Sequence, residues 1–298
     1  MKKELRPMNN LQAPIIVDGI AAVIEKYRAL VLDLWGVLHD GEVAFPHAIT
    51  ALNALRAKHV DICLLSNSPR RAAQVAKHLE SMGIEPSKYD YIVTSGELVY
   101  KALEKASDDW HRALAARYFH IGPPELAGLL RGLDRFEVVS PRDADFILTT
   151  GGSTQPPDEV AALLKECVSR KLPMVCANPD LVVLVGDQLV VCAGALAEQY
   201  EALGGEVFYH GKPYSSAYRH ALDLLGYESH EVLAVGDSLR TDVAGGRNEG
   251  MDVLFIASGI HRKAAGDLKA GKFSSALLQQ FFAREPVVPT FAASLFRW

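Results

Sequence analysis

The chain has 298 residues, of which 49% are hydrophobic and 22% charged, and its formal net charge is -5. These values are typical of a soluble globular protein with one large domain or two ordinary ones, and without a basic excess they argue against nucleic acid as a partner. No long uninterrupted apolar run predicts a membrane span or a signal peptide, so we expect a cytoplasmic protein.

Residues 1–97 alternate between short apolar segments and helical patterns. The helical patterns lie at 46–59 and at 70–83, and Gly83 ends the second one. Buried strands are predicted on either side of them, at ALVLDLWG (29–36), DICLLSN (61–67) and YDYIVTSG (89–96). Strands that alternate with helices indicate a parallel sheet with right-handed crossovers.

Residues 98–204 carry a set of elements of their own. A helix is predicted at 157–170. The apolar segment 181–197 is interrupted by Gly-Asp-Gln at 186–188, which predicts a hairpin of two short buried strands rather than a membrane span. Further strands are predicted at YFHIG (118–122), FEVVS (136–140), DFILTTG (145–151) and LPMVCAN (172–178).

The pattern of the first segment returns after residue 204. Strands are predicted, with helices between them, at EVFYHG (206–211), EVLAVGD (231–237) and DVLFIASG (252–259). We therefore predict an α/β protein with a parallel-sheet core from residues 1–97 and 205–298, interrupted by a second α/β domain at 98–204. The aromatic-rich tail, 281–298, is predicted to pack on its own core, with a homodimer contact as the alternative.

Polar residues follow four of the predicted strands. In an open parallel sheet, ligands bind beyond the carboxyl ends of the strands, so these residues are expected to meet at one site. They comprise a carboxylate that can act as a nucleophile, hydroxyl and amide donors, a cation, and two carboxylates five positions apart that suit a hard metal ion. In chain order they are Asp33, Ser66 with Asn67, Lys212, and the pair Asp237 and Asp242.

Three of these motifs also have an ordinary structural explanation, whereas the pair Asp237 and Asp242, five apart on a tight Gly-led turn, is a stronger signal. An Asp such as Asp33 after an apolar strand is often a helix cap, and Ser66-Asn67-Ser68-Pro69 on its own reads as a turn that starts a helix. Lys212 alone is a solvated residue of a Gly-Pro loop. Only the occurrence of all four motifs, in this order and at strand ends, favours a catalytic site.

The set of motifs resembles the haloacid dehalogenase (HAD) superfamily over about residues 28–262. The resemblance implies a Rossmann-like core with an inserted class II cap domain at 98–204. CANPD (176–180) and CAGALAEQYEALGG (192–205) are similar to subclass IIA, which includes phosphatases of sugar phosphates, nucleotides, p-nitrophenyl phosphate and pyridoxal phosphate. The implied activity is magnesium-dependent hydrolysis of a small phosphorylated metabolite.

The resemblance also implies a role for each motif. Asp33 attacks phosphorus and forms an aspartyl phosphate, while Ser66 and the amide of Asn67 hold the phosphoryl oxygens. Lys212 offsets the charge between Asp33 and the phosphoryl group. Magnesium is implied on Asp33, the backbone carbonyl of Trp35 and Asp237, with Asp242 a direct or outer ligand. Two residues of the cap loop, Asn178 and Asp180, are implied to lie near the substrate.

The chain departs from the family pattern at Trp35. Most phosphatases of the superfamily carry a second Asp there, which protonates the leaving oxygen and then activates water. Trp35 does neither, and losing a general acid–base costs roughly 10²- to 10⁴-fold in rate. His39 or Asp40 is a candidate substitute acid, although His39-Asp40-Gly41 also reads as a surface turn.

Three functions are therefore considered, and a phosphatase restricted to good leaving groups, or using another acid, ranks first. A phosphometabolite-binding or regulatory protein with little turnover ranks second. A dehalogenase ranks third, because Asp237 and Asp242 are retained and dehalogenation does not need magnesium.

Overall fold

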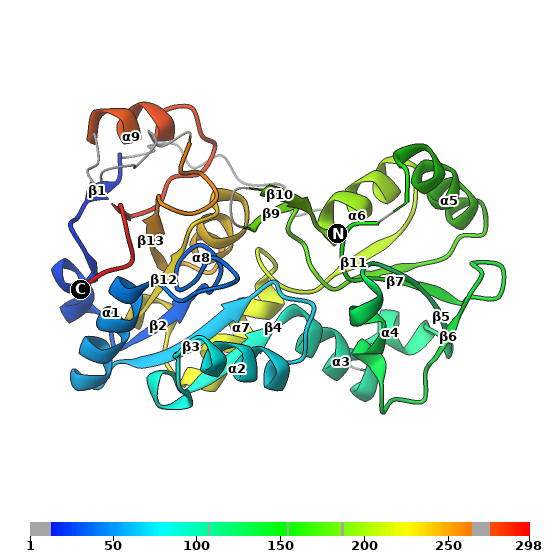
Figure 1. The fold of residues 1–298 in the computed structure, drawn as a ribbon, viewed down its shortest axis with the longest axis horizontal. Helices are drawn as coiled ribbons and strands as arrows, with labels where there is room; N and C mark the ends of the chain where they lie inside the picture. Colours follow the sequence, from blue (N-terminus) through cyan, green and yellow to red (C-terminus); the bar gives the residue numbers. More distant parts are fainter. Residues whose placement is uncertain (1–12, 107, 154, 186–187, 264–274) are drawn as a thin grey trace.

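The structure is a computed structural model that describes residues 13–106, 108–153, 155–185, 188–263 and 275–298. The molecule consists of a larger and a smaller part that lie side by side, each built around its own sheet (Figure 1). None of the helices in the described ranges is long and apolar enough to cross a membrane.

Seven strands of the described residues form the sheet of the larger part, and all neighbouring pairs are parallel. Their order is β1 (Ile15–Ile16), β14 (Phe291–Ala293), β13 (Asp252–Ile256), β12 (Val232–Gly236), β2 (Ala29–Leu32), β3 (Asp61–Ser66) and β4 (Tyr91–Thr94). The central strands are almost uniformly apolar, as expected for a parallel sheet that is buried on both faces.

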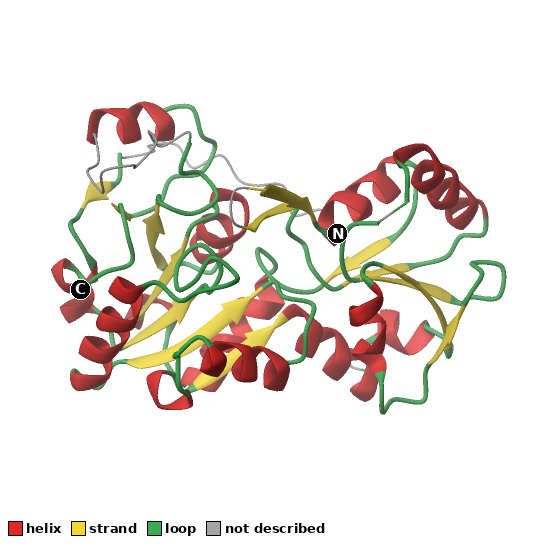
Figure 2. Cartoon of the chain, in the orientation of Figure 1, coloured by secondary structure: helices red, strands yellow, loops and turns green. Residues whose placement is uncertain are grey.

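Helices cover both faces of this sheet (Figure 2). Alternate residues of β2 belong to different cores, because side chains of a strand point to opposite faces: Leu30 and Leu32 pack in one, Ala29 and Val31 in the other. The helices of the larger part are α1 (Pro46–Ala57), α2 (Ala72–Ser81), α7 (Ser215–Leu225), α8 (Ala244–Asn248) and α9 (Ser275–Phe282). Helix α3 (Ser95–Lys105) follows β4 but packs through Val99 and Leu103 in a core of the smaller part. The predicted α/β class with a parallel, Rossmann-like core is thus confirmed.

The smaller part contains a five-stranded parallel sheet. Its strands lie in the order β11 (Val207–Tyr209), β8 (Met174–Cys176), β7 (Phe146–Thr149), β5 (Arg117–Ile121) and β6 (Phe136–Val138). The helices of this part are α4 (Asp109–Ala113), α5 (Pro157–Ser169) and α6 (Ala193–Ala202). Helices α5 and α6 share a core with residues of β7, β8 and β11.

One strand lies in a different sheet from the one expected. Residues 206–211 are expected in the core from their sequence, whereas β11 pairs with β8 in the smaller sheet, with Val207 opposite Met174. The chain re-enters the larger part only after this strand, at Gly211 and Lys212. A strand followed by a helix has the same local pattern in either sheet, so the pattern alone does not assign the strand.

The predicted hairpin is present as a separate antiparallel pair, β9 (Val182–Val185) and β10 (Gln188–Val191). The prediction that its strands are buried is wrong: β9 is mostly half-buried and all four residues of β10 are exposed, because the pair lies outside both larger sheets. Its turn residues 186 and 187 lie outside the described residues. The hairpin lies between the two parts of the molecule (Figure 1). The C-terminal tail packs on its own core, as predicted from the sequence. Strand β14 joins the larger sheet and Phe296 is buried.

Short helical turns complete the described chain. Six of them lie at Ile20–Ala22, Ile24–Lys26, Pro86–Lys88, Pro124–Leu130, Ser229–Glu231 and Leu239–Val243. The last of these follows β12 directly and carries Asp242, so this turn sets the direction in which the Asp242 carboxylate points.

Candidate active site

Three carboxylates meet at the carboxyl ends of two adjacent strands. Asp33 follows β2 and Asp237 follows β12, and these strands are neighbours in the sheet. One side-chain oxygen of each, together with one of Asp242, lies within 4.8 Å of the others, and all three residues are buried. Three oxygen donors at this spacing fit a hard divalent cation such as Mg²⁺, whose charge would offset theirs.

Gly36 lies so close to the Asp237 carboxylate that no larger side chain fits at position 36. Gly36 has φ +78°, and a Cβ atom there would lie 2.1 Å from Asp237 Oδ2. The same oxygen accepts a hydrogen bond from the backbone N–H of Ile260 at 2.7 Å. Glycine at position 36 is therefore required both by the left-handed backbone and by the close approach of this carboxylate.

Lys212 joins two of the carboxylates. Its Nζ donates hydrogen bonds to Asp33 Oδ1 at 2.5 Å and to Asp242 Oδ1 at 2.7 Å. The other oxygen of Asp242 accepts a hydrogen bond from the backbone N–H of Ser238 at 3.1 Å. Because protein groups bind both of its oxygens, Asp242 fits an outer position around a cation better than Asp237 does.

Asn67 holds the backbone of Lys212 in place. Asn67 Oδ1 accepts the Lys212 N–H at 2.7 Å, and Asn67 Nδ2 donates to the Lys212 carbonyl at 3.0 Å. The preceding Gly211 has φ +118°, and a Cβ atom there would lie 2.4 Å from Asn67 Oδ1. Ser66, one position earlier, lies at the end of β3 and lines a cleft between the two parts of the molecule.

The electrostatics of the cluster follow from its burial. Burial raises the pKa of Asp33 to about 7, although the charge of Lys212 lowers it. Burial, with the charge of Asp33, also holds the pKa of Asp237 well above its usual range. For Lys212, burial lowers the pKa, but the charges of Asp242 and Asp33 outweigh it and the pKa lies well above its usual value. The carboxylates therefore lack enough positive charge nearby, which a divalent cation would supply.

This electrostatic balance predicts a pH-dependent stabilisation by Mg²⁺. Without a metal, folded Asp33 titrates near pH 7, whereas the unfolded residue titrates near 3.8. The folded protein therefore binds more protons in this interval, and the free energy of unfolding falls as pH rises from about 4 to 7. Because Mg²⁺ competes with that proton, its affinity should be at least roughly tenfold lower at pH 5.5 than at pH 7.5.

The measurement is the melting temperature in EDTA and in a Mg²⁺ titration at both pH values. We expect Mg²⁺ to raise the melting temperature at pH 7.5 and to do so much less at pH 5.5. The matched control is Asp237→Asn, in which this effect should be lost. Equal stabilisation at both pH values would contradict the assignment of the cation to these carboxylates.

The loop that carries Asn178 and Asp180 reaches this site from the smaller part. Asn67 Nδ2 donates a hydrogen bond to Asp180 Oδ1 at 2.9 Å, and Asn178 Oδ1 accepts the N–H of Asp180 at 3.0 Å. Burial raises the pKa of Asp180, while the charge of Lys212 lowers it. Arg240 donates to the carbonyl of Pro179 at 2.7 Å, so several contacts fasten this loop to the larger part.

The Trp35 indole makes its hydrogen bond to the β9–β10 hairpin. Its Nε1 donates a hydrogen bond to the carbonyl of Leu184, 149 positions away, at 2.6 Å. The indole also lies against the backbone of Gly41, where a Cβ atom would be 2.3 Å from the ring. Trp35 thus links the loop after Asp33 to the β9–β10 hairpin.

The two substitute acids considered in the sequence analysis are poorly suited to donate a proton at neutral pH. His39 is buried behind Trp35, with ring centroids 5.3 Å apart, and burial lowers its pKa to about 4. Asp40 lines the cleft, but its carboxylate accepts the N–H groups of Val43 and Glu42, and these bonds lower its pKa.

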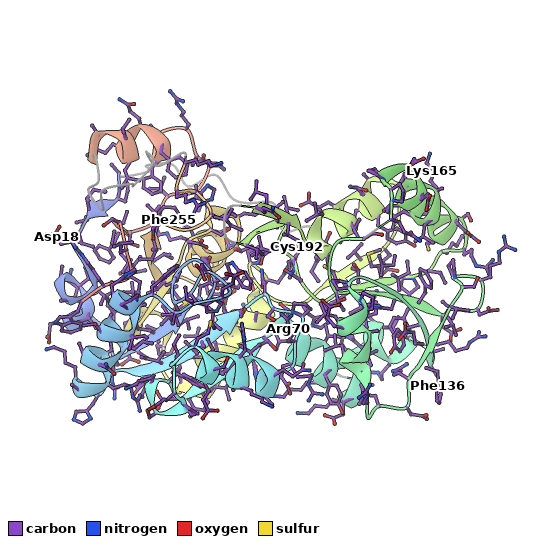
Figure 3. All side chains as sticks on the ribbon, in the orientation of Figure 1. Asp18, Arg70, Phe136, Lys165, Cys192 and Phe255 are labelled. Carbon is purple, nitrogen blue, oxygen red and sulfur yellow. The ribbon has the colours of Figure 1, made fainter. Side chains whose placement is uncertain are left out.

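A cleft of about 650 Å³ lies between the two parts and opens onto the cluster. Arg70 from the larger part and Cys192 from the smaller part both line it, and both are labelled where the two parts meet (Figure 3). All nine residues proposed from the sequence line this cleft: Asp33, Trp35, Ser66, Asn67, Asn178, Asp180, Lys212, Asp237 and Asp242. Residues of the β9–β10 hairpin also line the cleft but were not proposed from the sequence. The signal that could have identified them is that aliphatic residues fill both strands of this short hairpin.

Comparisons with known proteins find similarity along much of the chain. A family model described as haloacid dehalogenase-like hydrolase matches residues 30–135, and one described as HAD-hydrolase-like matches 209–279. Ribonucleotide monophosphatase NagD of Escherichia coli K12 is 26% identical over 237 residues, which cover 78% of this chain and 88% of NagD. An acid sugar phosphatase of Staphylococcus aureus USA300 is 26% identical over 241 residues, which cover 80% of this chain and 89% of the relative.

A solved structure extends the similarity to almost the full length. A haloacid dehalogenase-like family hydrolase from Brucella suis 1330 is 33% identical, with a TM-score of 0.78. The match covers 94% of this chain and 99% of that one. A match of this extent takes in both parts of the molecule.

Proposed function

The chain belongs to the haloacid dehalogenase-like hydrolases, and from this membership we propose that it is a magnesium-dependent phosphatase of small phosphomonoesters, acting through an aspartyl phosphate on Asp33. The observation that carries the proposal is the buried contact of Lys212 Nζ with Asp33 and Asp242, at 2.5 and 2.7 Å, beside Asp237. A nucleophilic carboxylate, a fixed cation and a metal-binding carboxylate are what phosphoryl transfer requires in one place.

In the first step, an oxygen of Asp33 attacks phosphorus. The new O–P bond forms as the bond to the leaving oxygen breaks, and the electron pair leaves with that oxygen. Lys212, the backbone N–H of Asn67 and the hydroxyl of Ser66 would stabilise the negative charge on the other phosphoryl oxygens. Magnesium would be held by Asp33, the Trp35 carbonyl and Asp237, with Asp242 behind them, and would neutralise charge between the two anions.

In the second step, water hydrolyses the aspartyl phosphate, returning Asp33 and releasing inorganic phosphate. Trp35 supplies neither the acid for the first step nor the base for the second, because its indole N–H only donates. We infer that turnover is slow for alkyl phosphates, whose leaving oxygens need a proton, and faster for esters that leave as stable anions.

The smaller part would serve as the cap that selects the substrate. We propose that it comprises residues 98–204 together with β11, and that closure brings Asn178 and Asp180 to the substrate. The hydrogen bond from Asn67 to Asp180 supports this role, because it joins the cap loop to a residue that also holds Lys212. We also propose that the protein is cytoplasmic.

The proposal is tested by release of p-nitrophenol from p-nitrophenyl phosphate at neutral pH, with Mg²⁺ or with EDTA. This leaving group departs without protonation, so the test does not depend on an acid at position 35. Magnesium-dependent release is the expected result. Magnesium-independent chloride release from a 2-haloacid would favour the dehalogenase.

The second candidate, a phosphometabolite-binding protein with little turnover, is favoured only by Trp35. Binding of a phosphate ester without any release of p-nitrophenol, in a folded protein that binds Mg²⁺, would support it over the phosphatase.

A further inference from the structure

Arg240 reaches from the larger part of the molecule to two elements of the smaller part. It lies in the turn Leu239–Val243, two positions before Asp242. Its Nη1 donates a hydrogen bond to the carbonyl of Pro179 at 2.7 Å, and its Nη2 donates to Glu198 Oε1 at 2.5 Å. Pro179 belongs to the loop of residues 178–180 and Glu198 to helix α6, so one side chain holds both elements.

The 178–180 loop and helix α6 are also joined to each other. The N–H of Gly194, in the first turn of α6, donates a hydrogen bond to the carbonyl of Asp180 at 3.1 Å. A Cβ atom on Gly194 would lie 2.3 Å from the Pro179 carbonyl oxygen, the same atom that Arg240 binds. Glycine at this position therefore lets the helix lie directly against the loop, and Arg240 binds the resulting unit at two points.

Asp180 extends this connection into the catalytic cluster. Its Oδ1 accepts a hydrogen bond from Asn67 Nδ2 at 2.9 Å, and the same side-chain amide binds both the N–H and the carbonyl of Lys212. Lys212 Nζ in turn donates to Asp242 Oδ1 at 2.7 Å. Because Asp242 lies on the same turn as Arg240, these contacts form a closed ring that crosses twice between the two parts of the molecule.

The side-chain amide of Asn67 makes all the hydrogen bonds that it can make. Nδ2 has two protons, one for Asp180 Oδ1 and one for the Lys212 carbonyl. Oδ1 accepts the Lys212 N–H at 2.7 Å and the Ser95 hydroxyl at 3.3 Å. If Asp180 moved away, one N–H of this buried amide would lose its partner. A shift of the 178–180 loop therefore disturbs the group that holds Lys212.

We propose, building on the phosphatase function above, that Arg240 is a positioning residue that couples the place of the cap to the contact between Lys212 and Asp33. From the larger part, the buried Tyr218 holds the turn of Arg240, since its hydroxyl donates to the Asp242 carbonyl at 3.2 Å. The turn therefore keeps its place when Arg240 is replaced. What changes is the 178–180 loop, and through it the alignment of Lys212.

Two substrates separate this role from a simpler one, in which Arg240 only helps the cap to touch the substrate. Acetyl phosphate has a good leaving group but little beyond it for a cap to contact, whereas p-nitrophenyl phosphate carries a ring. A role limited to contacts with the substrate would raise KM for p-nitrophenyl phosphate and leave acetyl phosphate unaffected. A role through Lys212 lowers kcat for both, because both need the same charge stabilisation at phosphorus.

Arg240→Gln should lower kcat for both substrates by on the order of 10²-fold with Mg²⁺ present, because small misplacements of catalytic groups cost about this much. Arg240→Lys keeps the charge and should lose less. The melting temperature should change little, since the Arg240 and Glu198 side chains are 39% and 48% exposed and such ion pairs add little stability. Arg142→Gln is the control, because Arg142 pairs with Glu166 inside the smaller part and outside the ring, and its kcat should equal that of the wild type.

A double variant tests whether Arg240 acts through Asp180. Asp180→Ala removes the acceptor of the Asn67 N–H and should lower kcat for acetyl phosphate as well. If both residues act through one chain of contacts, the double variant Arg240→Gln/Asp180→Ala should lose about as much as the weaker of the two single variants. Independent roles would instead multiply the two losses.

The outcomes distinguish this inference from the function on which it rests. An unchanged kcat for acetyl phosphate in folded Arg240→Gln and Arg240→Lys, or multiplied losses in the double variant, would overturn the role of Arg240 and leave the phosphatase intact. Failure of the wild type to hydrolyse either substrate above the rate without protein would overturn the phosphatase itself.

Discussion

Asp33→Asn should reduce Mg²⁺-dependent p-nitrophenol release by on the order of 10⁴-fold or more. The amide keeps the size of the side chain and its place at the end of β2, but it is not a nucleophile toward phosphorus. It also removes one of the two carboxylates that Lys212 Nζ contacts. The loss should therefore appear in kcat at saturating substrate, and not only in KM.

The control for this variant is Asp134→Asn, an identical change at an exposed position of the smaller part. Both variants should fold, as judged by circular dichroism and by a cooperative thermal transition. Retention of more than a few per cent of the wild-type kcat in folded Asp33→Asn would show that another group attacks phosphorus.

Trp35→Asp should raise kcat for hexyl phosphate by roughly 10²-fold and change kcat for p-nitrophenyl phosphate far less. Residue 35 lines the cleft two positions after the proposed nucleophile, so a carboxylate there is placed to protonate a leaving oxygen. The same change removes the hydrogen bond to Leu184 and a large apolar ring from the lining of the cleft. We therefore expect KM for aryl phosphates to rise while kcat for alkyl phosphates rises.

Trp35→Ala is the matched control, because it removes the ring and the hydrogen bond without adding a carboxylate. It should raise KM for aryl phosphates but should not raise kcat for hexyl phosphate. If Trp35→Asp folds, is stabilised by Mg²⁺ like the wild type and yet gains nothing on hexyl phosphate, the absence of an acid at this position is not what limits turnover.

The larger sheet could be predicted from the sequence because its strands are continuous apolar runs with helices between them. The meeting of Asp33 and Asp237 could be predicted for the same reason, since parallel neighbouring strands end at one edge of the sheet. Burial of the strands leaves few other places for polar residues, so those at the strand ends stand out.

The contacts between the two parts could not be predicted in this way. Nothing in the local pattern of β11 says which sheet it joins, and nothing near Trp35 identifies Leu184 as its partner, 149 positions away. Asn67 is similar: its side chain connects Lys212 to Asp180 through hydrogen bonds that depend on how the two parts are packed. Periodicity describes single elements, whereas these contacts depend on the placement of one sheet against another.

The most direct test of the account is a rapid-quench experiment with p-nitrophenyl phosphate carrying a radioactive phosphoryl group. Trp35 supplies no base for the second step, so p-nitrophenol should appear in a burst stoichiometric with protein, before inorganic phosphate. The label should be acid-stable and alkali-labile on the peptide that contains Asp33, and it should be absent from Asp33→Asn. Label on a different residue, or undiminished release of both products by folded Asp33→Asn, would contradict the assignment of Asp33 as the nucleophile.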